Sequence, residues 1–577
     1  MSYQQTAAKW LEYTQLEAEW KDQLSIIVQD EKRLEDAFYK DLEFGTGGMR
    51  GEIGVGTNRM NTYTVRKASQ GVADYVKAAG TEAMKKGIVI AYDSRRKSPE
   101  FAQEAASTFA KNGIQAYVYG EPRTTPQLSF SVRELGAFMG IVVTASHNPP
   151  EYNGYKVYGE DGAQLNIEDA EAVIAFVQQV GDELAIKAGN TEEYLQNGLI
   201  QVIGQDLDQA YLDKVATIQH QPKFAGKNAL KVVFSPLHGA SGSTVRQLMK
   251  HTGYENFMYV EDQMEPNGEF PTLKSPNPEE AGAFELAMKL GRETAADVLI
   301  TADPDGDRVG VAVQLGGNYE LLTGNQTGAI LIEYLLTQLK EKGQMPANGR
   351  VFKTIVTSDL GRVIAEYHGS STEDVLTGFK FIGEKIQQYI ETNEYTFLFG
   401  YEESYGYLIQ PFVRDKDAIQ SVLAITEAAA FYKAQGKTLL DVLDDLFERH
   451  GYYFEGLVSI TKKGADGARA IQGLLTNLRH QPLTEVAGIT ISSQEDYLKQ
   501  TRSFTDGRKD EHLTLPKADV LKYFLADGSW VCVRPSGTEP KIKYYIGVTS
   551  PTRAESKEKL NSIKTQFTEE MERRFSM

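Results

Sequence analysis

The alternation of short apolar strands with amphipathic helices, repeated three times along the chain, is the feature that most restricts its fold. In the first copy an apolar strand at 87–92 is followed by a helix from about 100 to 112, and then by strands at 115–119 and 138–143. The same order begins again near residue 230 and once more near residue 324. This alternation predicts α/β domains. No repeat is visible at the level of single residues, so the copies share an architecture only.

The chain is too long for a single hydrophobic core, since it has 577 residues. Residues 7–41 have a helical pattern whose aromatic residues fall near one face. The last hundred residues change to strands mixed with two helices. We therefore expect a helical lead-in at 1–42 packed on the first domain, α/β domains at 43–205, 206–320 and 321–450, and a smaller α+β domain at 451–577.

Charge and composition exclude several classes of protein. The formal net charge is -18, which argues against a general binder of nucleic acids or anionic membranes because the far field repels phosphates. A small anionic substrate still fits if basic residues gather in one cleft. Cys532 is the only cysteine, so neither an intrachain disulfide nor a cysteine-based zinc site can form. The N-terminal residues lack a signal-peptide pattern and no apolar run is long enough to cross a membrane, so we expect a cytoplasmic location.

A serine lies where the strand at 138–143 ends. The sequence continues as Thr144-Ala145-Ser146-His147-Asn148-Pro149-Pro150, and the two prolines keep the turn out of the helical conformation. Loops that leave strand ends carry the active groups of α/β sheets. A serine-histidine pair alone would also fit an ordinary strand exit. Residues 151–158 resemble a hairpin-like return that brings Lys156 back towards the serine, although an isolated lysine there is usually a surface residue.

Asp303, Asp305 and Asp307 occupy alternate positions on a loop that follows the strand at 297–300. Carboxylates this close repel one another unless a cation is bound, and oxygen ligands favour Mg²⁺, Ca²⁺ or Mn²⁺. An EF-hand is excluded, because its required glycine would fall at Arg308 and its final glutamate at Gln314. A solvated acidic turn is the remaining alternative. Three ligands leave room for a further oxygen, and a phosphate is the usual partner of protein-bound Mg²⁺.

Three further loops carry groups suited to a phosphate or a sugar. The glycine-rich stretch 43–51 contains Arg50, whose guanidinium can bind a phosphate through two hydrogen bonds. The segment 534–538 combines an arginine, two hydroxyl groups and a glycine, which suits a phosphate nest. Residues 399–406 place carboxylates and a hydroxyl group on a loop after a strand, and such groups suit sugar hydroxyls. Each loop alone would also fit an ordinary turn, and Arg414-Asp415-Lys416-Asp417 would fit a solvated charge run.

Four of these motifs occur in a characteristic order: Thr144-Ala-Ser-His-Asn-Pro, Asp303-x-Asp-x-Asp-Arg, Gly400-Tyr-Glu-Glu-Ser and Arg534-Pro-Ser-Gly-Thr-Glu-Pro. Together they resemble the α-D-phosphohexomutase superfamily over nearly the whole chain from Glu43 on. The resemblance implies four domains in a heart-shaped arrangement, with three similar α/β domains with mixed sheets and a smaller C-terminal α+β domain. The Glu-Glu-Ser loop looks most like the phosphoglucomutase branch. The lead-in and residues 411–417 look closest to the longer subgroup that also includes phosphopentomutases.

The resemblance also implies roles for individual residues. Ser146 would be the phosphoserine, and it would complete a site for one Mg²⁺ with Asp303, Asp305 and Asp307. Lys156 would be the general acid/base with His147 assisting, and Arg50 and Arg308 would bear on the transferring phosphate. The residues implied to meet the sugar are Thr377, Glu402, Ser404 and Lys416. Those implied to meet the distal phosphate are Arg534, Ser536, Gly537 and Thr538.

The implied reaction interconverts α-D-glucose 1-phosphate and glucose 6-phosphate through glucose 1,6-bisphosphate, which also acts as the activator. A phosphopentomutase or a mutase of broad specificity for mannose or ribose phosphates is the nearest alternative. A serine phosphatase and a non-enzymatic phosphosugar-binding protein are the alternatives from other classes. We expect a monomer or weak homodimer. The chain departs from the family pattern at Gly47, Tyr401, Ala418 and Lys543. None of these removes a catalytic group, but Tyr401 and Ala418 weaken any inference about the preferred sugar.

Overall fold

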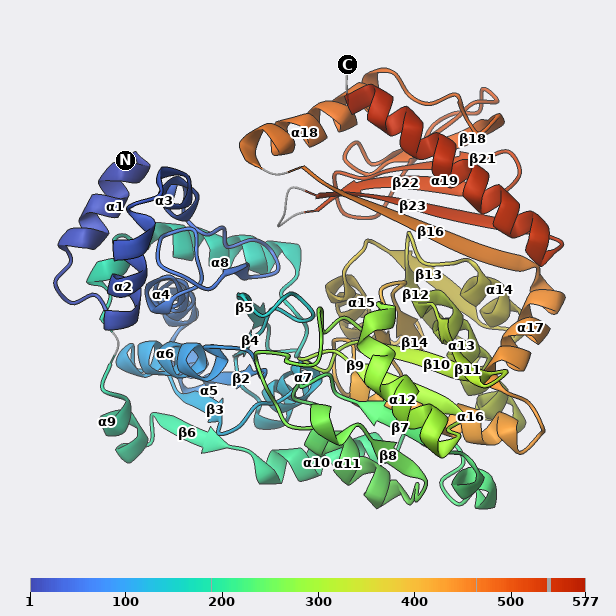
Figure 1. The fold of residues 1–577 in the computed structure, drawn as a ribbon, viewed down its shortest axis with the longest axis horizontal. Helices are drawn as coiled ribbons and strands as arrows, with labels where there is room; N and C mark the ends of the chain where they lie inside the picture. The colour runs from blue at the N-terminus through green and yellow to red at the C-terminus, as the bar shows by residue number, and fades with distance from the viewer. Residues whose placement is uncertain (1, 188, 463, 537–540, 576–577) are drawn as a thin grey trace. The chain divides into compact units, whose positions relative to one another are not determined.

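The structure is a computed structural model that describes residues 2–187, 189–462, 464–536 and 541–575 (Figure 1). It divides into two compact units. The first comprises Met1–Thr327 and Phe379–Thr438, and the second comprises Gly328–Gly378 and Leu439–Met577. The domain boundaries expected at residues 42, 205, 320 and 450 are a different division and stay a prediction. Within the described residues, no helix combines the length and the apolar character needed to cross a membrane.

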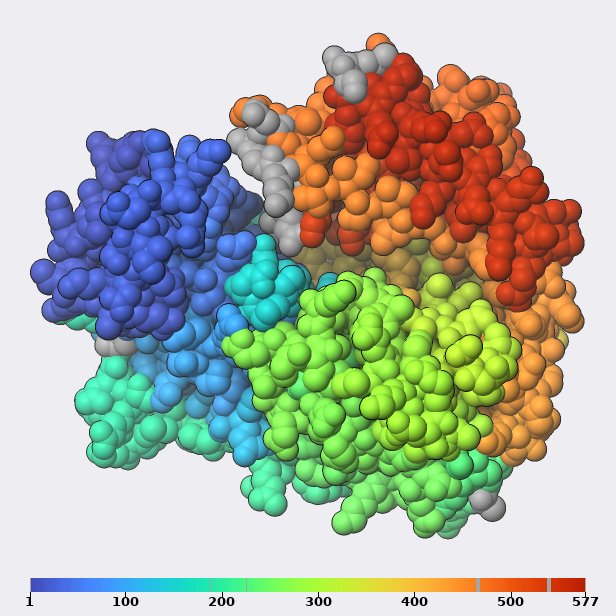
Figure 2. All heavy atoms as spheres, in the orientation of Figure 1, coloured from blue at the N-terminus to red at the C-terminus, as the bar shows by residue number. Residues whose placement is uncertain are grey.

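Three short helices begin the first unit: α1 (Tyr3–Glu12), α2 (Ala18–Ile27) and α3 (Glu31–Phe38). Trp10 and Trp20 are buried, because their rings pack under these helices and against the rest of the first unit. The Trp10 indole donates a hydrogen bond to Glu183 over 2.9 Å, and its ring meets Tyr63 of α4 (Thr62–Ala79) edge-on. In the space-filling view these helices form one continuous dark-blue lobe (Figure 2).

The first sheet of this unit has six strands in the order β1-β5-β4-β2-β3-β6. Four of its strands are mutually parallel, namely β4 (Met139–Val143), β2 (Ile88–Tyr92), β3 (Ala116–Tyr119) and β6 (Ile200–Ile203), which forms one edge. Two antiparallel strands, β5 (Tyr152–Tyr158) and β1 (Met49–Glu52), extend the sheet beyond β4. The helices of this region are α4, α5 (Thr81–Lys86), α6 (Ser98–Lys111), α7 (Thr125–Leu135), α8 (Ile167–Gln179) and α9 (Thr191–Gln196). The loop after β4 therefore connects two antiparallel neighbours and leads directly into β5.

The second sheet has five strands in the order β11-β10-β9-β7-β8. Its parallel strands are β7 (Val232–Ser235), β8 (Phe257–Tyr259) and β9 (Val298–Ala302), whereas β10 (Val309–Leu315) and β11 (Asn318–Leu322) are antiparallel. The accompanying helices are α10 (Gln205–Ala216), α11 (Gly242–Thr252) and α12 (Glu285–Thr294). All five residues of β9 are buried, and the strand runs directly into Asp303.

The third α/β region contributes to both units. The first unit contains α15 (Phe379–Thr392), the antiparallel pair β14 (Thr396–Tyr401) and β15 (Tyr407–Leu408), and α16 (Ala418–Lys433). The second unit contains the parallel pair β12 (Gly349–Thr354) and β13 (Ser371–Val375) with α14 (Leu360–Tyr367) and α17 (Leu439–His450). The region begins with α13 (Gly324–Glu341).

The C-terminal sheet is antiparallel throughout, in the order β16-β23-β22-β21-β18-β19-β20, with β17 paired to β18. Its strands are β16 (Tyr452–Thr461), β17 (Glu485–Val486), β18 (Ile489–Asp496), β19 (Thr501–Phe504), β20 (Glu511–His512), β21 (Leu521–Leu525), β22 (Trp530–Pro535) and β23 (Lys541–Ser550). The helices α18 (Gly464–His480) and α19 (Arg553–Phe575) cover one face, and Ile563, Phe567 and Met571 of α19 are buried there. Three α/β domains with mixed sheets and a C-terminal β domain with helices confirm the predicted fold class.

The N-terminus of α16 joins two parts of the first unit through a buried carboxyl group. Asp417 accepts hydrogen bonds from the backbone amides of Ile419 and Gln420 and from the hydroxyl group of Tyr211 on α10. The next residue, Ala418, donates its amide to the carbonyl oxygen of Gly306. Burial outweighs these hydrogen bonds and raises the pKa of Asp417 to about 6.

We predict a pH-dependent loss of stability from Asp417. The folded chain keeps this proton to a higher pH than the unfolded chain, so the free energy of unfolding falls as pH rises from about 4 to about 6. Asp417→Asn removes this contribution, which amounts to at most about 3 kcal/mol. Denaturant unfolding of both proteins between pH 4 and 6.5 measures it. Asp30→Asn, which caps α3 with an exposed side chain, is the matched control. A wild-type-minus-variant difference that does not change with pH would contradict the prediction.

Candidate active site

Ser146 lies directly after β4 in a backbone conformation that is rare for a residue with a side chain. Its φ of 53° is in the left-handed region, which costs a non-glycine residue about 1–3 kcal/mol unless its surroundings hold it there. The side chain is only 3% exposed. Its Oγ donates to Oδ2 of Asp303 over 2.7 Å and lies 3.2 Å from Nδ1 of His147. The serine therefore faces the acidic loop of the second sheet.

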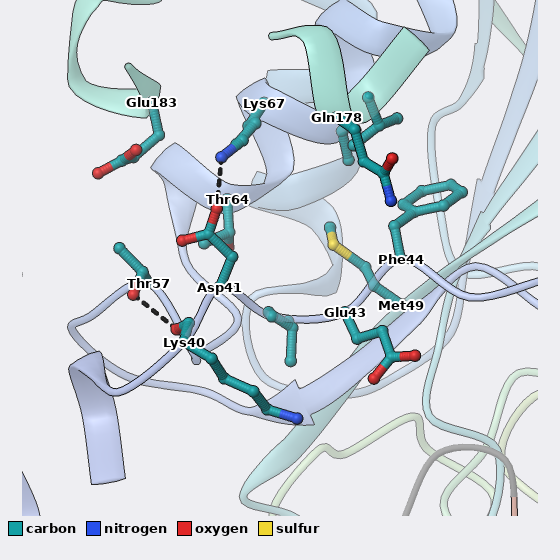
Figure 3. A pocket seen from close by; sticks show the side chains of 13 residues that line it. Lys40, Asp41, Glu43, Phe44, Met49, Thr57, Thr64, Lys67, Gln178 and Glu183 are labelled. Carbon is teal, nitrogen blue, oxygen red and sulfur yellow. Dashed lines mark hydrogen bonds and ion pairs between the residues drawn. The ribbon is translucent and has the colours of Figure 1, made fainter. Parts of the chain in front are cut away.

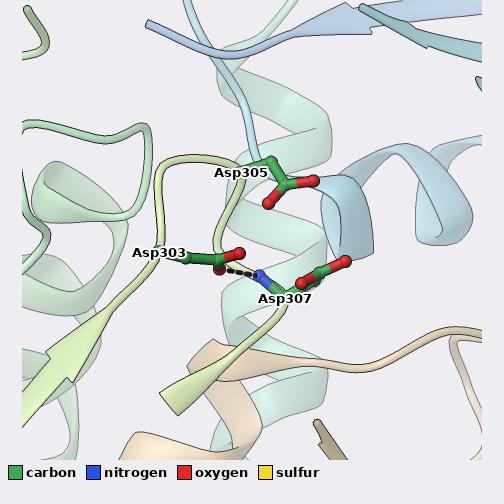
Figure 4. A group of neighbouring side chains, drawn as sticks. All are labelled: Asp303, Asp305 and Asp307. Carbon is green, nitrogen blue, oxygen red and sulfur yellow. Dashed lines mark hydrogen bonds between the residues drawn. The ribbon is translucent and has the colours of Figure 1, made fainter. Parts of the chain in front are cut away.

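The three aspartates that follow β9 form a compact, buried cluster (Figure 4). One ligand atom from each lies within 4.8 Å of the others. Asp303 Oδ1 accepts from the backbone amides of Asp307 and Arg308, which fixes one end of the loop. The loop can turn because Gly306 has a φ of 64°, and a Cβ there would lie 2.5 Å from the Thr124 side chain.

The cluster has the properties of a cation site. Among the residues that the structure describes, Oδ1 of Asp305 and Oδ1 of Asp307 have no hydrogen-bond partner although both are buried. Burial and then the charges of Asp305 and Asp307 raise the pKa of Asp303 well above its ordinary value. Hard carboxylate oxygens with free lone pairs, beside the Ser146 hydroxyl group, fit Mg²⁺. The three carboxylates are therefore the residues that would hold the metal.

Two lysines from distant parts of the chain offset the negative charge of this cluster. Lys156 pairs with Val142 across β4 and β5, and its Nζ lies 2.9 Å from Asp305 Oδ2. Burial alone would raise the pKa of the Asp305 carboxyl group, but the charge of Lys156 outweighs burial and lowers this pKa. Lys416 lies 3.1 Å from Asp307 Oδ2, and the charges of Asp307 and Asp415 outweigh its burial and raise its pKa. Both ammonium groups thus lie against the acidic cluster.

The remaining predicted phosphate-binding groups lie around the serine. Arg308 follows the acidic loop and donates to Glu279 over 2.7 Å. Arg50 on β1 donates to the Asn148 side chain of the serine loop over 3.3 Å. Burial, followed by the charges of Arg308 and Arg50, lowers the pKa of His147 well below its ordinary value. Its imidazole is therefore neutral at pH 7, and because the serine proton goes to Asp303, a tautomer protonated at Nδ1 can donate to the serine oxygen.

The loop between β14 and β15 joins this group of residues. Residues Arg308 and Gly406 form an isolated antiparallel bridge, and the amide of Val309 donates to the carbonyl oxygen of Tyr405. Glu402 on the same loop is 4% exposed, and burial raises the pKa of its carboxyl group although Lys416 opposes the shift. Ser404, two residues further on, is half-buried. The structure thus brings the Glu402 loop to the arginine that follows the aspartates.

Three of the predicted site residues that the structure describes belong to the second unit and not to the first. Thr377 follows β13, and its buried hydroxyl group has no hydrogen-bond partner among the described residues. Arg534 lies on β22 opposite Lys543 of β23, and the amide of Ser536 donates to the carbonyl oxygen of Lys541. Gly537 lies outside the described residues, as does Thr538.

A separate cavity of about 300 Å³ lies in the first unit between the lead-in and the first domain (Figure 3). Met49, Phe44 and Val177 line it with the ion pair between Lys67 and Asp41, which measures 2.7 Å. It contains none of the predicted site residues. The acidic cluster is therefore identified by its chemistry and not by the size of a hollow.

Comparison with known proteins agrees with this geometry. Four models of the phosphoglucomutase/phosphomannomutase family match the chain in order. Alpha/beta/alpha domains I, II and III match residues 41–183, 209–316 and 323–450, and the C-terminal domain matches 479–562. The chain belongs to this family, within the α-D-phosphohexomutase superfamily. The predicted resemblance is confirmed.

Relatives with assigned functions match over nearly the same length. A phosphoglucomutase of Staphylococcus epidermidis is 39% identical over 529 residues, which cover 90% of this chain and 93% of that protein. A phosphoglucomutase of Staphylococcus aureus is 37% identical and covers 92% and 93%.

Solved structures show the same fold. Parafusin, a phosphoglucomutase from Paramecium, has a TM-score of 0.66 at 17% identity and covers 89% of this chain and 91% of its own. A phosphoglucomutase/phosphomannomutase family protein from Burkholderia thailandensis has a TM-score of 0.63 at 18% identity and covers 92% and 97%.

Membership of the family confirms the predicted class of enzyme, an intramolecular phosphotransferase of the isomerase class that acts on a phosphosugar. Several residues of this site were absent from the sequence-based prediction. Thr125 donates its hydroxyl group to Asp305 over 3.0 Å, and Glu279 holds Arg308. Neither residue carries a local signal, because Thr125 begins α7 and Glu279 lies in a loop, each distant in sequence from its partner.

We predict that Mg²⁺ stabilises the protein through the aspartates. A ligand that binds only the folded state adds about 2.7 kcal/mol at about 100 times its Kd. Titration of EDTA-treated protein with Mg²⁺ is expected to raise the midpoint of thermal unfolding. Asp307→Asn should reduce that rise by at least half, because it removes one buried negative charge from the site. Asp213→Asn, on the exposed face of α10, serves as the control. Equal rises in the two variants would place the binding elsewhere.

Proposed function

We propose that the chain is a Mg²⁺-dependent phosphoglucomutase that interconverts α-D-glucose 1-phosphate and glucose 6-phosphate. The reaction passes through a phosphoserine at Ser146 and a glucose 1,6-bisphosphate intermediate. The observation that carries the proposal is the contact of the Ser146 hydroxyl group with Asp303, inside a buried acidic cluster that Lys156 also contacts. The Staphylococcus relatives named as phosphoglucomutases support the choice of glucose.

In this proposal Ser146 carries a phosphoryl group on Oγ. A hydroxyl oxygen of the bound glucose phosphate forms a new bond to phosphorus while the bond to Oγ breaks, which yields glucose 1,6-bisphosphate. The bisphosphate then presents its other phosphate, and the serine oxygen takes that group back. Phosphoryl transfer needs mainly alignment and neutralisation of charge, which is what the cations near Ser146 offer.

The side chains around the serine divide this work. Lys156 exchanges the proton with the reacting sugar hydroxyl group, and neutral His147 donates from Nδ1 to the Ser146 oxygen when the serine carries no phosphate. Arg50 and Arg308 bind the oxygens of the transferring group. A Mg²⁺ held by Asp303, Asp305 and Asp307 would neutralise negative charge on the phosphate oxygens. Glu402, Ser404, Lys416 and Thr377 are proposed to bind the sugar hydroxyl groups.

The second phosphate of the substrate needs a site of its own. Arg534 and Ser536 supply a guanidinium fork and a hydroxyl group, which suit a phosphate. Gly537 and Thr538 complete this proposed loop. A monomer or weak homodimer is proposed for the oligomeric state.

The second candidate is a mutase that prefers a pentose phosphate or accepts several phosphosugars. Tyr401, which is fully buried beside Glu402, favours keeping this candidate, because it interrupts the loop that would meet the sugar. Parallel rates with glucose 1-phosphate, mannose 1-phosphate and ribose 1-phosphate separate the two.

A ³¹P NMR time course tests the proposal. With Mg²⁺ and a trace of glucose 1,6-bisphosphate, glucose 1-phosphate is expected to convert to glucose 6-phosphate without release of inorganic phosphate. Omission of the bisphosphate should slow the conversion. Release of inorganic phosphate would instead identify a phosphatase, and conversion of ribose 1-phosphate alone would identify a pentose enzyme.

Substitution of the serine separates catalysis from binding. Ser146→Ala is expected to lower kcat by at least about 1,000-fold, since no other group can carry the phosphate. The affinity for glucose 1-phosphate, measured by calorimetry, should stay within a few-fold of the wild type. Ser107→Ala on α6, where the hydroxyl group donates to a helical carbonyl oxygen, is the matched control. Turnover by Ser146→Ala at the wild-type rate would refute the phosphoserine.

A further inference from the structure

The loop between β2 and α6 places the buried residues Asp93 and Arg95 beside the serine loop, yet none of the roles proposed above uses them. β2 and β4 are parallel neighbours, so their carboxyl ends share one edge of the sheet. Asp93 follows β2 directly and is fully buried. Its Oδ1 accepts from the Arg95 amide and the Ser98 hydroxyl group, at 3.0 and 2.8 Å. Its other oxygen is directed at the serine loop.

Thr144 links that oxygen to the backbone of Ser146. The Thr144 hydroxyl group donates to Asp93 Oδ2 over 2.6 Å and accepts from the Ser146 amide over 2.8 Å. One hydroxyl group thus uses both its proton and a lone pair in a chain from Asp93 to the serine. The hydrogen bond to the amide restrains Ser146 in the left-handed conformation that directs its Oγ at Asp303.

Arg95 holds the rest of the serine loop through hydrogen bonds from its guanidinium to backbone carbonyl oxygens of the loop. Its guanidinium donates to the carbonyl oxygens of Pro149 and Tyr152, at 2.8 and 3.1 Å, and also to those of Ser146 and Asn148. Two successive prolines prevent this segment from forming a regular helix or sheet, so these carbonyl groups need an outside donor. Arg95 supplies it while its side chain is 0% exposed and lies 3.3 Å from Asp93.

The same loop also fixes the strand that carries Lys156. Asn153 at the start of β5 donates to the carbonyl oxygen of Arg96 and to the Ser98 hydroxyl group, each at 2.9 Å. The serine and the lysine are therefore both tied to residues 93–98, one through Thr144 and Arg95 and the other through Asn153. Burial of an ion pair costs desolvation free energy, so such a pair adds little net stability. Its better-attested role is to define one geometry.

We propose that Asp93, Arg95 and Thr144 are positioning residues of the phosphoryl transfer. They hold Ser146 in its left-handed conformation, so that the phosphate-carrying oxygen stays aligned with the acidic cluster in both directions of the reaction. This inference rests on the proposed mutase function. None of the three side chains is assigned to the sugar, so their loss should lower kcat and leave KM nearly unchanged.

Thr144→Val tests the proposal, because valine keeps the shape of threonine but can neither donate nor accept. A misalignment of the reacting atom by about 1 Å costs on the order of 100-fold, so we expect kcat for glucose 1-phosphate to fall by about that factor. KM should stay within about 2-fold by the same reasoning. Thr144→Ser, which keeps the hydroxyl group, should retain most of the wild-type kcat. Thr108→Val, which removes a buried hydroxyl group on α6 that donates only to a helical carbonyl oxygen, is the control for lost stability.

A second variant and a second readout keep the test decisive. Ser98→Ala removes a donor to Asp93 and the acceptor of Asn153 but leaves the contacts of Thr144 and Arg95 with the serine loop, so it should lower kcat in the same direction but less. Mass spectrometry after incubation with glucose 1,6-bisphosphate reports how much of each protein carries the phosphate. Absence of phosphorylation and turnover in the wild type would refute the proposed function itself. An active wild type with equal kcat in Thr144→Val, or equal losses in Thr144→Val and Thr144→Ser, would overturn the positioning role alone.

Discussion

Three carboxylates that are buried within 4.8 Å of one another repel strongly, and much of the first unit is arranged to offset that repulsion. Backbone amides at the end of the acidic loop take one carboxylate, Lys156 of the first sheet takes the second, and Lys416 takes the third. Each compensating group comes from a different part of the chain. Stabilisation of the cluster therefore draws on three separate stretches of the first unit.

This arrangement gives a physical reason for the way the chain divides into compact units. The segment Phe379–Thr438 clusters with the first unit, although the strands β12 and β13 that precede it belong to the second. Lys416 and Asp417 lie in that segment, and they contact Asp307 and the helix α10, respectively. The attraction between Lys416 and Asp307 acts in a buried setting where water screens little, which makes it an effective link.

The sequence was most informative where the decisive information is local. A run of apolar residues that ends at Thr144 located β4 and the serine after it, and the alternate spacing of Asp303, Asp305 and Asp307 indicated a cation site and excluded an EF-hand. The hairpin-like pattern at 151–158 corresponds to β5, which returns antiparallel along β4 and places Lys156 opposite Val142.

Contacts between distant loops were beyond such reasoning. The run Arg414–Asp417 looked like any solvated charge run, yet Lys416 is close to Asp307 and Asp417 is fully buried. No role was predicted for Arg95 from the sequence, and only the fold shows that it donates to four backbone carbonyl oxygens of the serine loop and the start of β5. The roles of the site residues and the domain boundaries stay predictions.

The antiparallel register of β4 and β5 also restricts which insertions and deletions the sequence can tolerate during evolution. Val142 lies opposite Lys156, and side chains alternate between the two faces of a strand. A shift of one residue in β5 would turn Lys156 to the other face of the sheet and bring Tyr155 or Val157 towards the aspartates. The turn that joins β4 and β5 can therefore change in length only if the residues of β5 keep the same pairing with β4. Insertions and deletions in this stretch should be rare for that reason, even though the turn itself lies partly at the surface.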